Sequence, residues 1–418
     1  MKPLKNICIA LICVSALAFA HEDNGKREEW QIWSPRAEIR PAGIKMADGS
    51  MILTSAAVPQ AFGGWVKSVK GIQPGLWFRF EVEYQTEGLN QPWNQVQIKL
   101  IWMDQKWNPI SDAEYAWREQ KSGPWTHVYE DVIAPPGAKF AEMQLLIYNA
   151  EGGSAIFRNP AVELTDPPAP RPVRIATINY RLNQSPGGPA NAAILHKFTL
   201  DKLIQPTDLI VFGEGVTVVG SGRTYADVAE DADGPTAAEL GKLAKAKNSY
   251  VVAGIYERDG AVIYNTAILL DRQGKLAGKY RKVYLPREEV ERGLFPGKEM
   301  KVFPTDFGKL GLMICYDVFF AEPAKSLAMQ GAEIIAMPIW GGNEILAQAR
   351  SIESRAFLAA AGYDHPTYIQ DPNGERLAHA KDNASIAYAE IDLNRRYREK
   401  YLGDMKARRQ RETLKGLW

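Results

Sequence analysis

The sequence predicts two structured domains of different class, an all-β domain followed by an α/β domain. Residues 28–165 contain short stretches in which apolar and polar residues alternate, such as "GLWFRFEVEYQT" at 75–86, with turn residues between the stretches. No long amphipathic helix interrupts them. From residue 173 onward, strand-like and helix-like runs alternate instead. Short alternating strands are typical of a β-sandwich, whereas strand–helix alternation is typical of a layered α/β fold.

The first residues, "MKPLKNICIALICVSALAFA", combine a basic start at Lys2 and Lys5 with an apolar run at 7–17. They end in Ala18-Phe19-Ala20, which has the small-residue spacing of a cleavage site. This pattern predicts a secretory signal peptide over residues 1–20 and a mature protein that is secreted or periplasmic. No later apolar run is long enough for a membrane-spanning helix, so no membrane span is expected.

Residues 21–166 form the predicted β-sandwich, and nine of the 11 tryptophans lie between Trp30 and Trp125. The layout, which ends in "GGSAIFRNPAVEL" at 152–164, resembles the galactose-binding-like jelly-roll modules of carbohydrate-binding proteins. Exposed aromatic rings can stack on sugar faces, so the resemblance implies a glycan as a possible partner. The alternative is that these rings fill the core of the domain or cover a neighbouring domain.

A proline-rich linker follows at 167–172 and separates the two predicted domains. The α/β domain is expected over 173–393, with strands at 173–180, 208–214, 249–257, 261–271, 309–317 and 332–340. Helices are expected at 189–204, 235–247, 320–330 and 343–361. The remaining residues, 394–418, form a basic tail that favours a helix packed on this domain or on a partner subunit over an anion-binding segment.

Cys315 ends the apolar run "KLGLMIC" and precedes a predicted helix. The chain has 3 cysteines, and removal of a signal peptide would take away Cys8 and Cys13. Cys315 would then be the only thiol, so it is either a reactive group or a buried apolar filler. In layered α/β folds, ligands bind at the carboxyl ends of strands, and a nearby helix N-terminus favours a thiolate. This position makes Cys315 a candidate nucleophile.

Two further polar residues are candidates for the same site. Glu214 ends "LIVFGE", and Lys282 lies in "GKYRKVYLP". Together with "GLMICYDVFFAE", the Phe-Pro-Gly at 295–297 and Pro338-Ile-Trp340, these motifs resemble the nitrilase superfamily of carbon–nitrogen hydrolases. The resemblance covers most of residues 173–392, and several motifs occur in the family's order.

The resemblance implies an α-β-β-α sandwich, in which two sheets pack face to face with helices outside, and a homo-oligomer. It also implies catalytic roles for Glu214, Lys282 and Cys315, with the backbone N–H of Tyr316 holding the oxyanion. Lys282 beside the sulfur would favour the thiolate, and Glu214 would move the protons. No metal or organic cofactor is implied.

The family also uses a second glutamate to position the substrate. In "PREEVERGLFPG" we expect Glu291 in this role, with Glu289 as the alternative. The sequence departs from the common family pattern at four further positions, which leaves the substrate pocket open: Gly213, Tyr284, Phe319 and Ala321.

The sequence therefore predicts hydrolysis of a non-peptide carbon–nitrogen bond, in a small-molecule carboxamide or N-carbamoyl compound, through a thioester on Cys315. An acyltransferase that uses the same residues is the first alternative. A glycan-binding surface protein with an inactive hydrolase domain is the second. The net charge of +1 gives no reason to expect nucleic acid as a partner.

Overall fold

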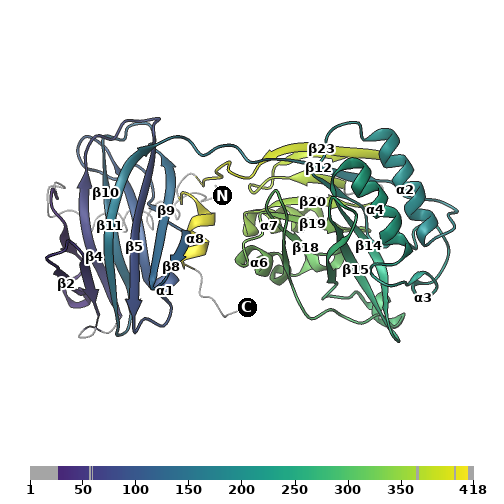
Figure 1. The fold of residues 1–418 in the computed structure, drawn as a ribbon, viewed down its shortest axis with the longest axis horizontal. Helices are drawn as coiled ribbons and strands as arrows, with labels where there is room; N and C mark the ends of the chain where they lie inside the picture. The colour runs from purple at the N-terminus through teal and green to yellow at the C-terminus, as the bar shows by residue number, and fades with distance from the viewer. Residues whose placement is uncertain (1–26, 56–57, 59, 364–366, 400–401, 413–418) are drawn as a thin grey trace, which may run out of the picture. The chain divides into compact units, whose positions relative to one another are not determined.

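The computed structural model describes residues 27–55, 58, 60–363, 367–399 and 402–412. The predicted signal peptide lies outside these residues. The chain divides into two compact units between Pro168 and Ala169, inside the proline-rich segment (Figure 1). The segment from Arg398 through the C-terminal helix belongs to the first unit. Among the described residues, no helix combines the length and the apolar character needed to cross a bilayer.

Unit 1 consists of two antiparallel sheets that enclose one hydrophobic core. In β5 (Trp77–Glu87), buried and partly exposed residues alternate, because successive side chains of a strand point to opposite faces. The first sheet has the order β1 (Gln31–Trp33), β4 (Ala61–Val69), β10 (Phe140–Ala150), β6 (Val96–Met103) and β7 (Glu114–Tyr115). The second has the order β2 (Ala42–Lys45), β3 (Met51–Thr54), β11 (Ser154–Thr165), β5, β9 (Trp125–Ile133) and β8 (Arg118–Ser122).

The core between these sheets contains several of the clustered aromatic residues. Trp65 and Trp102 are buried in it with Phe80 and Phe157, and Trp107 is buried as well. These tryptophans therefore have a structural role. Glycan binding by the remaining aromatic residues of unit 1 stays a prediction.

The basic tail packs on unit 1 through helix α8 (Met405–Glu412). The side chain of Arg411 is almost fully buried, and its Nε donates a hydrogen bond to the carbonyl of Ala116 at 2.8 Å. Tyr115 donates from its hydroxyl to Glu412 at 2.9 Å, and Arg408 pairs with Asp112. Figure 1 draws α8 in yellow beside the strands of unit 1. The described part of the tail thus belongs to the fold of unit 1.

Unit 2 is a mixed α/β domain with two six-stranded sheets. One sheet has the order β16 (Leu276–Arg281), β15 (Val262–Leu270), β14 (Tyr250–Asp259), β13 (Leu209–Val211), β12 (Pro172–Asn179) and β23 (Ser385–Asp392). The other has the order β17 (Val302–Pro304), β18 (Lys309–Leu312), β19 (Ile334–Pro338), β20 (Phe357–Ala361), β21 (Thr367–Gln370) and β22 (Arg376–Ala380). The central strands β12–β13–β14 and β18–β19–β20 are parallel.

Three hydrophobic clusters hold these layers together. Val252 of β14 and Leu312 of β18 meet in a cluster between the sheets, whereas the adjacent Val251 points to the opposite face. That outer face is covered by α2 (Pro189–Lys202) and α4 (Pro235–Lys247). The outer face of the other sheet is covered by α6 (Ala321–Met329) and α7 (Glu344–Ser354). Because the central strands are buried on both faces, they are nearly continuous apolar runs.

One predicted helix is wrong in its length. The sequence predicts a helix over 343–361, but α7 ends at Ser354 and Phe357–Ala361 form strand β20. Arg355 adopts a left-handed conformation with φ of 51°, which terminates the helix. The alanine-rich segment that follows has high helix propensity, but it is fully buried between β19 and β21, and this tertiary pairing decides its structure.

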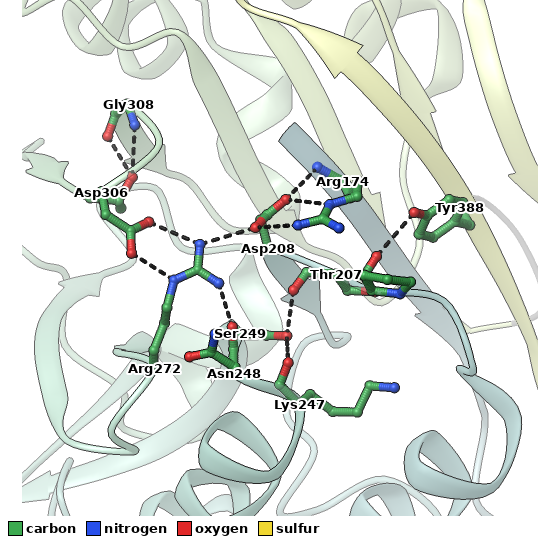
Figure 2. Close-up of polar contacts among 12 residues, drawn as sticks. Arg174, Thr207, Asp208, Lys247, Asn248, Ser249, Arg272, Asp306, Gly308 and Tyr388 are labelled. Carbon is green, nitrogen blue, oxygen red and sulfur yellow. Dashed lines mark hydrogen bonds and ion pairs between the residues drawn. The ribbon is translucent and has the colours of Figure 1, made fainter. Parts of the chain in front are cut away.

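An ion-pair network joins the two sheets of unit 2 at the amino ends of their parallel strands (Figure 2). Asp208, which immediately precedes β13, accepts hydrogen bonds from Arg174 Nε at 2.9 Å and from Arg272 Nη2 at 3.0 Å. Arg272 also donates from Nε to Asp306, in the loop between β17 and β18, at 2.6 Å. The opposite, carboxyl ends of the same strands carry the candidate site.

Candidate active site

The three candidate catalytic residues lie at strand ends and line one cavity of about 400 Å³. Glu214 follows β13, Lys282 directly follows β16, and Cys315 begins the short 3-10 helix η2 (Cys315–Phe319) after β18. The strands come from both sheets, so the face-to-face packing of the sheets brings together residues that are far apart in sequence. The sequence predicted strands that end near Glu214 and Cys315 but not β16 before Lys282, and the structure brings the three side chains to one place.

Cys315 has a strained backbone, and its thiol is held by a hydrogen bond. Its φ is 39°, in the left-handed region that residues with a side chain rarely adopt, as is common where a functional group must be aimed away from a strand. The thiol Sγ donates to the carbonyl of Gly341 at 3.0 Å. Burial and the nearby charge of Glu214 raise the pKa of the thiol, while Lys282 acts in the opposite direction.

The expectation that Lys282 would favour the thiolate concerns one of several influences on the Cys315 thiol. The contribution of Lys282 to the pKa of Cys315 has the expected sign, but burial and Glu214 outweigh it. Loss of the thiol proton is therefore disfavoured in the resting protein. A base must take its proton when the sulfur attacks, and Glu214 is the carboxylate that acts on the thiol most strongly.

Lys282 is bound between two carboxylates. Its Nζ donates to Glu214 Oε1 at 2.8 Å and to Glu289 Oε1 at 2.9 Å, and its side chain is 1% exposed. Burial opposes the charged ammonium, but the two carboxylates and Cys315 outweigh it and raise the pKa of Lys282. Asn265 of β15 donates from Nδ2 to the same two carboxylate oxygens, each at 2.7 Å.

The structure places Glu289, and not Glu291, beside Lys282. Glu291 is exposed and pairs with Arg287 at 2.6 Å on the outside of helix α5 (Arg287–Glu291). Glu289, the alternative, is 4% exposed and reaches Lys282. Two residues along a helix correspond to about 200° of rotation, so only one of the two can face the cavity. Burial raises the pKa of Glu289.

Asp317 connects the loop of Cys315 to the segment of Lys282. It is fully buried; its Oδ2 accepts from the backbone N–H of Ile314 and from the hydroxyl of Tyr280, both at 2.8 Å. Its Oδ1 accepts from the backbone N–H of Tyr284 at 3.1 Å. Burial raises the pKa of Asp317 to about 6, although these hydrogen bonds act to lower it.

Sequence reasoning missed three residues that shape the site. The motif "CYD" contained Asp317, but nothing in it indicated this connecting role. Asn265 lies inside an apolar strand, and its role becomes visible only when the structure shows it buried against polar partners. Tyr363 donates from its hydroxyl to the carbonyl of Glu214 at 2.6 Å. A Cβ at Gly213 would lie 2.9 Å from the Tyr363 ring, which explains the glycine before Glu214.

Tyr316 and the aromatic residues around it complete the cavity. Tyr316 lines it, and the Tyr316 ring contacts the rings of Phe319 and Phe320 at centroid distances of 5.3 and 5.6 Å. Tyr284, one of the departures from the common pattern, stacks on Phe320 at 3.8 Å. The residues described in the structure contain no cluster of three or more histidine, cysteine, aspartate or glutamate side chains that could hold a metal ion.

Comparison with known proteins gives the family of this chain. Residues 176–401 match the sequence profile of the family described as "Carbon-nitrogen hydrolase". The chain belongs to the carbon–nitrogen hydrolase family. This carbon–nitrogen hydrolase is 31% identical over 202 residues to omega-amidase NIT2 of Mus musculus, a match that covers 42% of this chain and 73% of the mouse protein.

Two further relatives illustrate the range of similarity. A hydrolase of Schizosaccharomyces pombe is 32% identical over 198 residues, which cover 40% of this chain and 60% of the yeast protein. The solved structure of an amidase from Nesterenkonia sp. is 23% identical, with a TM-score of 0.46 and coverage of 53% of this chain and 90% of that chain. The family match and the sequence relatives support carbon–nitrogen hydrolysis for this chain at the level of the family.

Proposed function

We propose that this carbon–nitrogen hydrolase cleaves a carboxamide or an N-carbamoyl group through a thioester on Cys315. The observation that carries the proposal is the contact of Lys282 with Glu214 at 2.8 Å inside the cavity that Cys315 also lines. A nucleophile, a base and a fixed positive charge are the three groups that acyl transfer from an amide requires.

In the first half of the reaction, Glu214 accepts the proton of the thiol as Sγ attacks the carbonyl carbon. The oxyanion forms beside the ammonium of Lys282 and the backbone N–H of Tyr316, which stabilise it. Glu214 then gives the proton to the departing nitrogen, and the carbon–nitrogen bond breaks to leave an acyl thioester. In the second half, Glu214 takes a proton from water, the hydroxyl attacks the thioester, and the thiol is restored as the carboxylic acid leaves.

Glu289 has a separate role in the proposal. Its Oε1 binds Lys282, whereas its Oε2 is buried without a hydrogen-bond partner among the described residues. A buried carboxylate oxygen without a partner is costly, so a substrate N–H that binds there would gain a strong hydrogen bond. Glu289 thereby replaces Glu291 as the proposed substrate-positioning residue.

The test is release of ammonia from a panel of amides, N-carbamoyl compounds and nitriles, with Cys315→Ala as the control. The proposal expects release from at least one amide or N-carbamoyl compound and none from the variant. Equal release by both proteins would refute the role of Cys315. Adding hydroxylamine separates the acyltransferase alternative, because a transferase forms hydroxamate in preference to acid.

A glycan array probed with the full-length Cys315→Ala variant tests the glycan-binding alternative. This alternative gains support only if the variant binds glycans and the wild-type protein hydrolyses no substrate of the panel. Secretion and homo-oligomer formation are two further proposals. N-terminal sequencing of the processed protein and light scattering of the purified protein test them.

A further inference from the structure

Five of the described residues that line the active-site cavity are aromatic. Tyr225 of helix α3 (Tyr225–Val228) and Tyr256 of β14 stack at a centroid distance of 4.2 Å on one side. Phe319 and Trp340 line the cavity as well and are 46% and 36% exposed. Large apolar rings with exposed faces favour contact with apolar or planar groups of a ligand.

The charges of the cavity are predominantly negative. Among the described residues that line it, Lys282 is the only basic one, and its Nζ already binds both Glu214 and Glu289. Glu288 also lines the cavity and accepts from the hydroxyl of Tyr225 at 3.2 Å. Arg292 does not line the cavity; it pairs with Glu288 at 3.0 Å and lies over the ring of Tyr225.

We infer that the cavity selects amides with an uncharged, apolar or aromatic acyl group and excludes those that carry a carboxylate. A carboxylate that enters such a cavity loses its water and finds no uncommitted cation to replace it, and it lies close to other carboxylates. An apolar acyl group pays no such cost and covers the aromatic walls. The inference concerns the substrate class of the proposed hydrolase and therefore rests on the proposed function.

Alkylation of Cys315 tests the selectivity without any need for turnover. Iodoacetamide, 2-iodo-N-phenylacetamide and iodoacetate differ in charge and apolar character, but each forms the same carbon–sulfur bond as iodide leaves. Rates are measured by mass spectrometry of the peptide that contains Cys315 and are divided by the rates with glutathione at the same pH. We expect the normalised rate with iodoacetate to be at least about tenfold lower than the normalised rate with iodoacetamide. The phenyl compound should have the highest normalised rate. Equal or faster reaction of iodoacetate would overturn the inference.

A matched pair of variants locates the effect. Phe319→Arg adds a guanidinium at the cavity and is expected to raise the normalised iodoacetate rate about tenfold. Ile204→Arg adds the same charge at a residue that is 81% exposed and lies just beyond α2, near the amino end of β13. This variant is expected to leave the normalised iodoacetate rate unchanged. A similar change in both variants would refute a local origin of the selectivity.

A hydrolysis assay separates this inference from the proposed function. Matched substrates are 3-phenylpropanamide, pentanamide and the monoamide of glutaric acid. Hydrolysis of the two neutral amides with little hydrolysis of the monoamide supports both proposals. A preference for the monoamide overturns the inference and leaves the hydrolase intact. Failure to hydrolyse any amide, together with slow alkylation by iodoacetate, refutes amide hydrolysis while the selectivity of the cavity stands.

Discussion

Replacing Asp317 by asparagine should change how the stability of unit 2 depends on pH. The pKa of Asp317 is about 6 in the folded protein, against an ordinary value of 3.8, because the carboxyl group is buried. The folded state therefore binds a proton that the unfolded state releases between these two pH values. The stability that Asp317 contributes is fully present below pH 3.8 and is lost as the pH rises through 6.

The size of the effect follows from the difference in pKa. About two pKa units correspond to about 3 kcal/mol of unfolding free energy. Asparagine keeps the shape of the side chain and an oxygen for Ile314 and Tyr280, but it cannot ionise. Its NH₂ group would face the backbone N–H of Tyr284, which costs about 1–3 kcal/mol at every pH. Relative to wild type, the variant should gain about 2.5 kcal/mol between pH 4 and pH 7, since part of the full difference already lies below pH 4.

The assay must follow unit 2 separately from unit 1. The full chain is equilibrated in urea at each pH and labelled with a short pulse of deuterium at one fixed pH, and peptides from β18 and η2 report unfolding. Comparison of the two proteins cancels the other titrating groups that they share. If the wild-type and Asp317→Asn stabilities run parallel from pH 4 to pH 7, Asp317 is not the buried acid described here.

Three further predictions concern the site and the opposite end of unit 2. Glu289→Gln should reduce amide hydrolysis about 100-fold or more, whereas Glu291→Gln should stay within about twofold of wild type; similar losses would contradict the assignment of Glu289. Arg272→Met should lower the unfolding free energy by about 1–3 kcal/mol in urea, with an unchanged kcat because the network lies at the other strand ends; a lower kcat would link it to the site. The rate of Cys315 alkylation by iodoacetamide should continue to rise with pH well above about 8.5, the usual pKa of a free thiol. Glu214→Gln should shift this rise to lower pH. A shift to higher pH would show that Glu214 does not raise the pKa of the thiol.

The sequence predicted the three catalytic candidates of the site but not the second glutamate. Glu214 and Cys315 each end an apolar run, and parallel strands in layered folds present their carboxyl ends together, whereas Lys282 was recognised only through its motif. Which face of a one-turn helix points inward cannot be derived from such a pattern. The choice between Glu289 and Glu291 was therefore decided only by the position of α5 against Lys282.

The division into an all-β unit and an α/β unit was also visible in the periodicity of the sequence. The length of α7 was not, because "RAFLAAAGY" has the composition of a helix. Long-range pairing with β19 made it a strand, and a left-handed Arg355 separated it from α7. Asn265 was missed for a related reason, since a buried amide is recognisable only once its partners are known.

The most direct test of the account is the mass of Cys315 during turnover. Wild-type protein is mixed with an amide that it hydrolyses, quenched in acid within the first turnovers, and digested. The account predicts the mass of the acyl group on the peptide that contains Cys315, and its loss as the substrate is exhausted. Continued release of ammonia by Cys315→Ala at the wild-type rate, with no acyl group on Cys315 in the wild type, would contradict it.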